Sequence, residues 1–402
     1  WERRELGDIA NVTKLAGFEF TEHVVYSDEG NIIALRGLNI KNGQLILDDV
    51  KYIDGSNFSK LSRSKLFIDD IMFTYVGTVG EVAIIKENDR FYLAPNVSRI
   101  RVKSDDSPKF ISHYMRTDNF KNKVIFPLIA TSSQPALSME NIRKFTINIP
   151  ISREEQDCLA KYFDSLDHLI TLHQRQCENA KKLKKFMLQK MFPKKNQKNP
   201  EIRFVGFTND WERRKLCEIC ERVTRKNKNN ESDLPLTIAS QFGLIDQRDF
   251  FNKVVAAKDM SNYYLLKKGE FAYNKSYSNG FDYGSIKRLN AYEQGCLSTL
   301  YICFGITSDE VESNYLECFF DTLKWYEDVS VICTEGARNH GLLNVDTKGF
   351  FDEVTVDLPK SLEEQKKISA YLNALDHLIT LHQNKCDELK KLKKFMLQNM
   401  FI

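Results

Sequence analysis

The segment LDHLITLHQ occurs twice in the chain, at Leu166–Gln174 and again at Leu375–Gln383. It belongs to a longer repeat, because residues 150–192 and 359–401 align at a fixed offset of 209 with 27 identities in 43 positions. A second match, WERREL at Trp1 and WERRKL at Trp211, opens each half of the chain. Internal repetition of this kind predicts two copies of one structural unit. The 402 residues are therefore two half-chains rather than one compact domain.

Between the repeated segments the two halves diverge. IDDIMFTYVGTVGEVAII at residues 68–85 still corresponds to KKGEFAYNKSYSNGFDYGSIKRL at residues 267–289. TSSQPALSMENIRKFTINIP at residues 131–150 likewise parallels EGARNHGLLNVDTKGFFDEVTVDLP at residues 335–359. These weaker matches predict one fold that carries two different surfaces.

The repeated segment has the pattern of a long helix. Apolar residues recur every seven positions in three rows, an a/d/e-type stripe wide enough to face another helix. Ser152 with Glu155 forms a capping box that Ser361 and Glu364 repeat, and no Gly or Pro interrupts either segment. We predict two rods of roughly 60 Å that pack antiparallel and relate the halves by a pseudo-two-fold axis. The candidate residues for this seam, or for a partner, are Leu166, Leu169, Ile170, His173, Leu375, Leu378, Ile379 and His382.

The rest of each half predicts an α/β (mixed α+β) domain with many short strands. The β-rich runs are Ile71–Tyr75, Val82–Lys86, Val97–Val102, Thr146–Ile149, Phe271–Asn274 and Thr299–Phe304. PKKNQKNP is polar and bounded by prolines, which is typical of a linker. We therefore predict globular domains at 1–150 and 211–358, spacer helices at 151–192 and 359–402, and a linker at 193–210.

Charge is distributed unevenly along the chain. The net charge is +3, but residues 151–200 carry 11 Lys or Arg against 6 Asp or Glu, and residues 201–358 carry 19 against 25. A broad basic field, the usual mark of a nucleic-acid-binding protein, is therefore missing from the composition. The nine irregularly spaced cysteines, and the lack of a signal peptide or of about 20 consecutive apolar residues, favour a soluble cytoplasmic protein.

The sequence contains few arrangements that predict a metal or catalytic site. His168 and His173 are five residues apart, about 140° round a helix, which is a poor geometry for one ion. Cys217 and Cys220 form a CxxC with no second CxxC, and Gly77-x-x-Gly80 lacks the Lys of a phosphate loop. No GxSxG, HExxH or dinucleotide motif is present. We predict no metal and no catalytic residue, and an enzyme of unknown type stays an open alternative.

Polar clusters in the divergent parts are the best candidates for recognition of DNA. Arg and Lys can pair with guanine, and Asn and Gln with adenine. The alternative is that these are ordinary polar loops. The candidate residues are Thr74, Tyr75, Thr131, Ser132, Ser133, Gln134, Asn274, Lys275, Ser276, Tyr277, Ser278, Lys287, Arg288, Arg338, Asn339 and His340. The repeated KKLKKFMLQ is more typical of a solvated helix face, although its lysines could also position a phosphate backbone.

Taken together, these segments resemble the specificity subunit of type I restriction–modification systems over essentially the whole chain. The resemblance rests on NPEIRFVGFTNDWERRKL, GARNHGLL, SQPALSMENIRKFTINIP and the two segments that run from EEQ to LDHLITLHQ. It implies two target-recognition domains separated by two antiparallel helices, each domain reading one half of a bipartite site in double-stranded DNA. It also implies a subunit that is not itself an enzyme.

The resemblance also implies the partners. The helices would dock two modification subunits, which supply S-adenosylmethionine chemistry on adenine, and restriction subunits would complete an ATP- and Mg-dependent nuclease. Two copies of one partner would explain why the helix is repeated, since they need two equivalent docking surfaces. Two rivals stay open. One is a helical adaptor that scaffolds other proteins without DNA specificity, and the other is a self-contained nuclease or methyltransferase, which the missing motifs disfavour.

One departure from the family pattern concerns the start of the chain. The residues RFVGFTND before Trp211 have no counterpart before Trp1, and the chain begins at Trp rather than Met. We therefore expect the first half to be truncated at its start.

Overall fold

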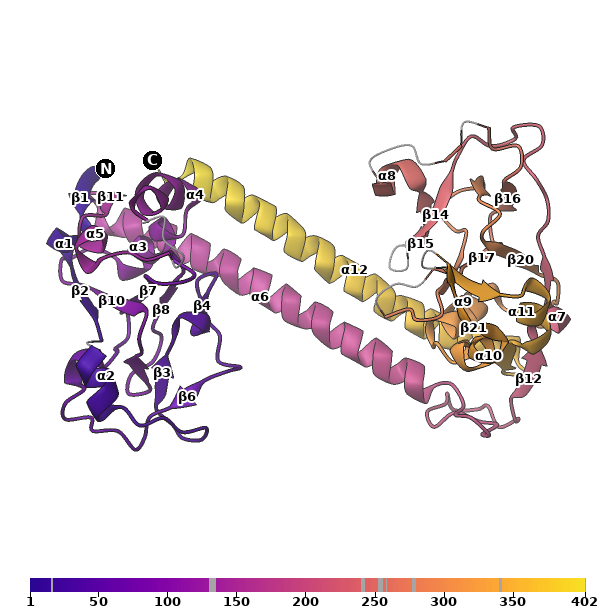
Figure 1. The fold of residues 1–402 in the computed structure, drawn as a ribbon, viewed down its shortest axis with the longest axis horizontal. Coiled ribbons are helices and arrows are strands. Elements are labelled where there is room, and N and C mark those ends of the chain that lie inside the picture. Colours follow the sequence, from indigo (N-terminus) through magenta and orange to yellow (C-terminus); the bar gives the residue numbers. More distant parts are fainter. Residues whose placement is uncertain are drawn as a thin grey trace. The chain divides into compact units, whose positions relative to one another are not determined.

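The computed structural model describes residues 1–15, 17–129, 135–239, 243–251, 256–257, 259–276, 280–339 and 342–401, without the side chains of 334–339 and 342. Contacts divide the chain into two compact units. The first unit is Trp1–Arg175 with Gln383–Ile402, and the second unit is Gln176–His382. Each unit thus combines one globular domain with parts of both long helices (Figure 1).

The first globular domain is built on a four-stranded antiparallel sheet. Its strand order is β2-β10-β7-β8, and a separate pair, β1 with β11, joins the start of the domain to its end. The strands are β1 (Glu2–Glu5), β2 (Ala10–Lys14), β3 (Ile33–Leu35), β4 (Ile40–Lys41), β5 (Gln44–Leu45), β6 (Lys51–Tyr52), β7 (Ile71–Thr74), β8 (Val82–Ile84), β9 (Phe91–Leu93), β10 (Val97–Val102) and β11 (Thr146–Ile149). The helices are α1 (Leu6–Ile9), α2 (Gly17–His23), α3 (Pro108–Met115), α4 (Asp118–Phe120) and α5 (Met139–Arg143), with short turns η1 (Gly37–Asn39), η2 (Ser62–Ser64), η3 (Lys121–Ile125) and η4 (Phe126–Leu128).

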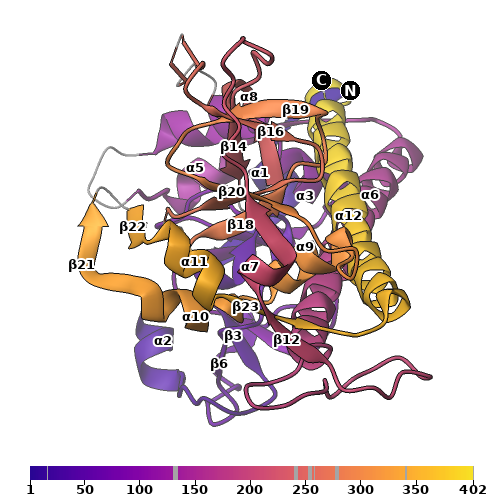
Figure 2. The ribbon, with the colours of Figure 1, turned by 90° about the vertical axis from the view of Figure 1, so that its right-hand side faces the viewer.

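The second globular domain repeats this sheet. Its order β13-β20-β17-β18 corresponds to β2-β10-β7-β8, and β12 pairs with β23 as β1 pairs with β11. The strands are β12 (Glu212–Lys215), β13 (Cys220–Arg222), β14 (Leu236–Ala239), β15 (Gly243–Asp246), β16 (Tyr264–Lys267), β17 (Phe271–Asn274), β18 (Ser285–Arg288), β19 (Gln294–Leu297), β20 (Ile302–Ile306), β21 (Cys333–Asn339), β22 (Leu342–Val345) and β23 (Thr355–Leu358). The helices are α7 (Leu216–Ile219), α8 (Gln247–Phe251), α9 (Ser313–Asp321), α10 (Trp325–Ile332) and α11 (Thr347–Glu353), and α10 packs against α11 and β21 (Figure 2).

The two repeated segments are continuous helices, as predicted. α6 (Arg153–Lys190) and α12 (Leu362–Asn399) each contain 38 residues. The hydroxyls of Ser152 and Ser361 accept hydrogen bonds from the backbone N–H groups of Glu155 and Glu364, which caps both helices. The predicted mixed α/β class and the tandem repeat are confirmed.

Within each unit the two helices run antiparallel. In the first unit Phe163 of α6 packs on Phe401, which follows α12, and Asp167 bonds to Lys393, so the partner number falls as the α6 number rises. In the second unit Cys177 lies against Ile379, and Lys184 bonds to Asp376. The antiparallel pairing predicted from the apolar stripe is thus present in both units.

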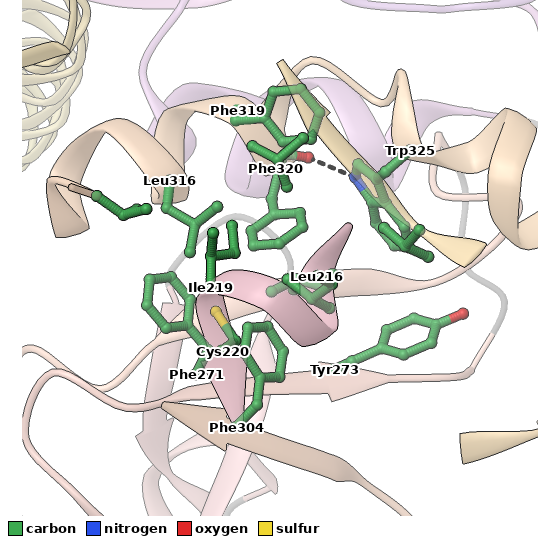
Figure 3. Close-up of a cluster of buried hydrophobic side chains, with 14 of the residues drawn as sticks. Leu216, Ile219, Cys220, Phe271, Tyr273, Phe304, Leu316, Phe319, Phe320 and Trp325 are labelled. Atoms are coloured by element: carbon green, nitrogen blue, oxygen red, sulfur yellow. Dashed lines mark hydrogen bonds between the residues drawn. The ribbon is translucent and has the colours of Figure 1, made fainter. Parts of the chain in front are cut away.

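The second domain has an aromatic core around β17. Phe271, Tyr273, Phe304 and Trp325 are fully buried, and the Trp325 indole N–H donates to the backbone carbonyl of Phe320 over 2.9 Å (Figure 3). Burial of one such ring contributes roughly 1.5–3 kcal/mol. In the second domain, β17, which precedes one of the divergent loops, is therefore fixed by buried aromatic side chains. Among the described residues, no helix is long and apolar enough to cross a membrane.

Candidate nucleic-acid interface

Each helix is anchored to its own domain by a repeated buried glutamine. Gln156 accepts a hydrogen bond from the Ser107 backbone N–H (2.7 Å) and donates to the Pro150 carbonyl (2.9 Å). Gln365 makes the matching bonds to the Glu312 N–H (2.8 Å) and the Pro359 carbonyl (2.9 Å). Because the same side chain holds the last strand and the α3 or α9 helix, the EEQ motif positions each domain on its helix pair.

A second repeated contact joins the WERR motif to the EEQ motif. The indole N–H of Trp1 donates to Glu155 over 2.9 Å, and that of Trp211 donates to Glu364 over 3.3 Å. In the second unit Arg203 adds a bidentate pair to Glu364, at 2.7 and 2.9 Å. The repeated WERR and EEQ motifs therefore fix how each domain is attached to its helices, and the divergent sequence forms the rest of each domain.

In each half, the structure joins the segment after β7 or β17 to a residue that follows the second predicted polar cluster in sequence. In the first domain the Leu137 N–H donates to the Tyr75 carbonyl over 2.8 Å, which joins the loop after β7 to the segment before α5. In the second domain the Leu343 N–H donates to the Lys275 carbonyl over 2.9 Å, at the equivalent place after β17. In each domain, two segments more than 60 residues apart in sequence thus meet just after an inner strand of the sheet.

In the first domain only part of the candidate set is described. Thr74 is fully buried, and its hydroxyl donates to the Thr78 carbonyl and accepts from the Glu81 N–H, so it shapes the β7–β8 turn. Tyr75 is partly exposed under Lys14, whose Nζ lies 5.7 Å from the ring centre, and burial raises the pKa of its hydroxyl. The candidates that lie outside the described residues are Thr131, Ser132, Ser133 and Gln134.

In the second domain the candidates separate into two groups. Asn274, Lys275 and Ser276 follow β17, and the Asn274 side chain accepts from the Ser276 N–H over 3.0 Å. Burial, and then the nearby Arg222 charge, lower the pKa of Lys275. Arg338 and Asn339 end β21, while the candidates outside the described residues are Tyr277, Ser278 and His340.

Lys287 and Arg288 lie elsewhere, against α9. Lys287 donates to Asp321 over 2.8 Å, and Arg288 bonds to Ser313 and Asn314 over 2.5 Å each. Both side chains are largely buried, so their contacts brace the sheet against α9. No observation tests whether any of the candidates contacts a base, and those assignments stay predictions.

Two basic residues beside these loops were not singled out in the sequence. Lys14 ends β2 and Arg222 ends β13, strands that lie at equivalent edges of the two sheets. Arg222 donates to the Tyr264 hydroxyl over 3.0 Å. Both follow the repeated WERR motif, Lys14 by ten residues and Arg222 by eight, but they end strands that the sequence analysis did not predict.

The predicted seam residues divide into a buried and an exposed set. Leu166, Ile170 and Leu375 are buried, and the Ile379, His173 and His382 side chains are partly buried. Leu169 and Leu378 are exposed, at 40% and 42%. They belong to an exposed apolar stripe that both helices carry at matching positions: Leu169, Leu172, Leu183 and Phe186 on α6, and Leu378, Leu381, Leu392 and Phe395 on α12.

The described residues contain no group of three or more His, Cys, Asp or Glu arranged to hold a metal. Of the CxxC pair, Cys217 is exposed and Cys220 is buried in the core of the second unit, where burial raises the pKa of the Cys220 thiol to about 12. A thiol of that kind remains protonated and is a poor metal ligand.

Both domains therefore share one scaffold and carry two unlike sets of polar loops. Residues 1–182 match the family model described as "Type I restriction modification DNA specificity domain". The chain is 24% identical over 424 residues to a putative type I restriction enzyme MjaX specificity subunit of Methanocaldococcus jannaschii, covering 98% of this chain and 91% of that protein.

Solved structures agree with this fold. A type I restriction–modification S subunit from M. genitalium superposes with a TM-score of 0.62 at 14% identity, covering 100% of this chain and 96% of that one. A chain from a structural study of complex assembly and conformational transition of the type I system gives 0.51 at 16%, covering 100% and 97%. Residues 1–182 thus match the type I DNA specificity domain, and the chain over its whole length is similar in sequence to a type I specificity subunit and in fold to a solved S subunit.

Proposed function

We propose that each globular domain reads one half of a bipartite sequence in double-stranded DNA. The observation that carries this proposal is the contrast between the anchors and the loops. The Gln156 and Gln365 anchors are the same in both units, whereas the loops that meet at Tyr75 and Lys275 differ in sequence. Two domains with the same scaffold and different polar loops fit a target with two unlike halves.

We further propose that the exposed apolar stripe docks two modification subunits, one on each unit. Leu169 is two residues from both Asp167 and Thr171, which bond to the first domain through Arg116 and Gln44. At 3.6 residues per turn Leu169 therefore points about 160° away from that domain. A helix with an apolar face on the modification subunit would cover the stripe, because exposed large side chains at helical spacing fit such a partner.

The presence of the stripe in both units supports a partner that is present twice. In the first unit it consists of Leu169, Leu172, Leu392 and Phe395, and in the second of Leu378, Leu381, Leu183 and Phe186. These are the same four repeat positions in each unit, contributed by opposite helices. S-adenosylmethionine would then be bound by the modification subunits, and ATP and Mg by restriction subunits that complete the cytoplasmic complex.

Methylation mapping tests the proposal. The chain is expressed with its modification subunit, and the DNA of those cells is read by single-molecule sequencing. A bipartite motif with a fixed gap, methylated on adenine, is the expected result, and it would also reveal the target. If a stable complex with the modification subunit forms but no new methylation is found, the adaptor alternative replaces this proposal.

A further inference from the structure

A basic pocket lies in the first unit, and three of its lysines take no part in the contacts described above. It has a volume of about 620 Å³ and lies between the β4–β5 hairpin, the α3–α4 region, α6 and the end of α12. Sites for small ligands usually have volumes of roughly 300–1,000 Å³. Six Lys or Arg side chains line the pocket against three Asp or Glu, a formal excess of three positive charges.

The acidic groups of this pocket are largely occupied. Asp167 accepts hydrogen bonds from both Arg116 and Lys393, and Glu81 accepts from the Asn42 N–H and pairs with Lys121 at 3.4 Å. Asp118 is the remaining carboxylate in the lining. The carboxylates therefore leave much of the positive charge around the pocket unbalanced.

Three lysines supply that unbalanced charge. Among the described residues, Lys41, Lys390 and Lys394 have no carboxylate oxygen within 4.0 Å, and all three are exposed at the pocket. Lys390 and Lys394 stand one turn apart on α12, where like charges destabilise a helix by roughly 0.2–0.5 kcal/mol. An anion between them and Lys41 would relieve this repulsion.

Two charged positions differ at the equivalent place in the second unit. Arg116 lies nine residues after Ser107, and Asp321 lies nine after Glu312, the residue anchored in the same way by its glutamine. The second unit thus has the carboxylate of Asp321 at the position where the first unit has the guanidinium of Arg116. Lys181, the counterpart of Lys390, also pairs with Glu178 at 3.3 Å. In the first unit the counterpart of Glu178 is Asp387, which accepts hydrogen bonds from the Gln383 side chain, at 3.2 and 3.3 Å, and does not pair with Lys390.

We propose that the pocket of the first unit binds phosphate groups, held by Lys41, Lys390 and Lys394. The polar side chains of Gln174 and Gln398 also line it and can donate further hydrogen bonds. Phosphate oxygens suit such a site, since ammonium groups bind them as point charges. The phosphates could come from the backbone of duplex DNA or from a free nucleotide. The site itself does not depend on the proposed reading of half-sites.

Two binding measurements on the full chain test this site and identify the source. Calorimetry with inorganic pyrophosphate, and then ATP, reports free phosphate ligands. Fluorescence anisotropy with a labelled 20-base-pair duplex of arbitrary sequence, repeated between 50 and 200 mM salt, reports backbone contacts. The test variant is Lys390→Gln/Lys394→Gln, and the matched control is Lys181→Gln/Lys185→Gln at the same repeat positions. Unchanged thermal midpoints establish that both variants fold.

The expected result is a loss in the test variant that the control does not show. If the duplex is the source, the slope of log K against log salt falls by about 1–2, since each lost phosphate contact removes roughly 0.9. If a nucleotide is the source, pyrophosphate and ATP bind the native chain and bind the variant at least tenfold more weakly. Equal losses in both variants, no loss in either, or equally tight binding of polyglutamate at the same lysines would overturn the proposal.

Discussion

The Nζ of Lys184 on α6 lies 2.8 Å from a carboxylate oxygen of Asp376 on α12. The same two repeat positions meet in the first unit, where Lys393 on α12 bonds to Asp167 on α6. The lysine belongs to KKLKKFMLQ and the aspartate to LDHLITLHQ. The two repeated motifs therefore recognise one another, and their joint repetition follows from the antiparallel pairing.

Each domain contacts the ion pair of its own unit, and the contacting residue is a cation in the first domain and an anion in the second. Arg116 of the first domain binds Asp167 at 3.0 Å, and Asp321 of the second domain binds Lys184 at 3.0 Å. The same kind of ion pair thus accepts a hydrogen bond from an arginine of the first domain and donates one to an aspartate of the second. This arrangement lets an invariant helix pair hold two domains whose sequences differ.

Removal of Lys184 should destabilise the chain, because Asp321 and Asp376 would lose their shared cation. Burial alone would lower the pKa of Lys184, but the two carboxylates outweigh it and raise that pKa. We expect Lys184→Met to lower the free energy of unfolding by about 1–3 kcal/mol, below the value for a fully buried pair because Asp376 is partly exposed. Urea unfolding measures the change. Lys185→Met, at an exposed neighbour, is the control and should stay within about 0.5 kcal/mol.

The repeated parts of the fold were predictable from sequence, and the reasons are physical. Helix periodicity and capping by Ser152 and Ser361 are local signals, and they predicted α6 and α12 to within two or three residues at each end. The strand Val97–Val102 was likewise predicted with its observed bounds. A hydrophobic pattern alone cannot tell a helix seam from an exposed stripe, so Leu169 and Ile170 were assigned to one set although only Ile170 is buried.

The candidate site was less predictable, because it depends on contacts between distant residues. Lys287 and Arg288 follow a polar loop in sequence, which made them candidates for DNA contact. Their burial against α9 arises from Asp321 and Ser313, more than 20 residues further along. The pairing of Lys275 with Leu343 also joins segments that no local pattern connects.

The Arg203–Glu364 pair should couple strongly to stability. Glu364 is almost fully buried, and besides Arg203 it has the Trp211 N–H as a donor. We expect Arg203→Met to cost about 2–4 kcal/mol, because it leaves a buried carboxylate short of donors. The double variant Arg203→Met/Glu364→Leu should recover more than half of that loss. A double-mutant cycle by urea unfolding checks this, and strictly additive costs would show that the pair is not coupled.

Charge placed in the apolar stripe should remove one docked modification subunit at a time. Leu172→Glu with Leu169→Glu should lower the stoichiometry in native mass spectrometry from two modification subunits per chain to one. Adding Leu378→Glu and Leu381→Glu should abolish the complex, since a buried carboxylate without a partner is strongly unfavourable. The control is Lys185→Glu, at an exposed position of α6 two residues from Leu183 and therefore on another face, which should leave two subunits bound. Retention of both subunits by the fourfold variant would contradict the docking proposal.

The loops of the second domain should control one half-site alone. Arg338→Ala/Asn339→Ala is expected to relax or abolish one half of the methylated motif and leave the other half unchanged. Loss of one good base contact typically costs about 1–3 kcal/mol of discrimination. Methylation mapping of the variant gives the answer. Equal weakening of both half-sites without a change in sequence preference would rule out base reading by these residues.

Acidification should weaken the first unit through His113. This side chain is buried and bonds to Asp164 at 2.9 Å. Burial lowers the pKa of His113, Asp164 and Asp167 partly oppose the shift, and Arg116 adds to it. A lowered histidine pKa means that the unfolded chain binds the proton first. The contribution of His113 to stability is therefore present above about pH 6.5, the unfolded value, and is lost as the pH falls below it.

The second unit provides a matched control for this effect. At the corresponding positions the Cys318 thiol lies 3.7 Å from the side-chain oxygen of Asn373, a pair that gains no proton in this range. The variant His113→Cys/Asp164→Asn copies that pair into the first unit. We expect the free energy of unfolding of the native chain to fall more between pH 7 and pH 5.5 than that of the variant. Urea unfolding at both pH values measures the difference, and parallel pH profiles would mean that His113 titrates alike in the folded and unfolded chain.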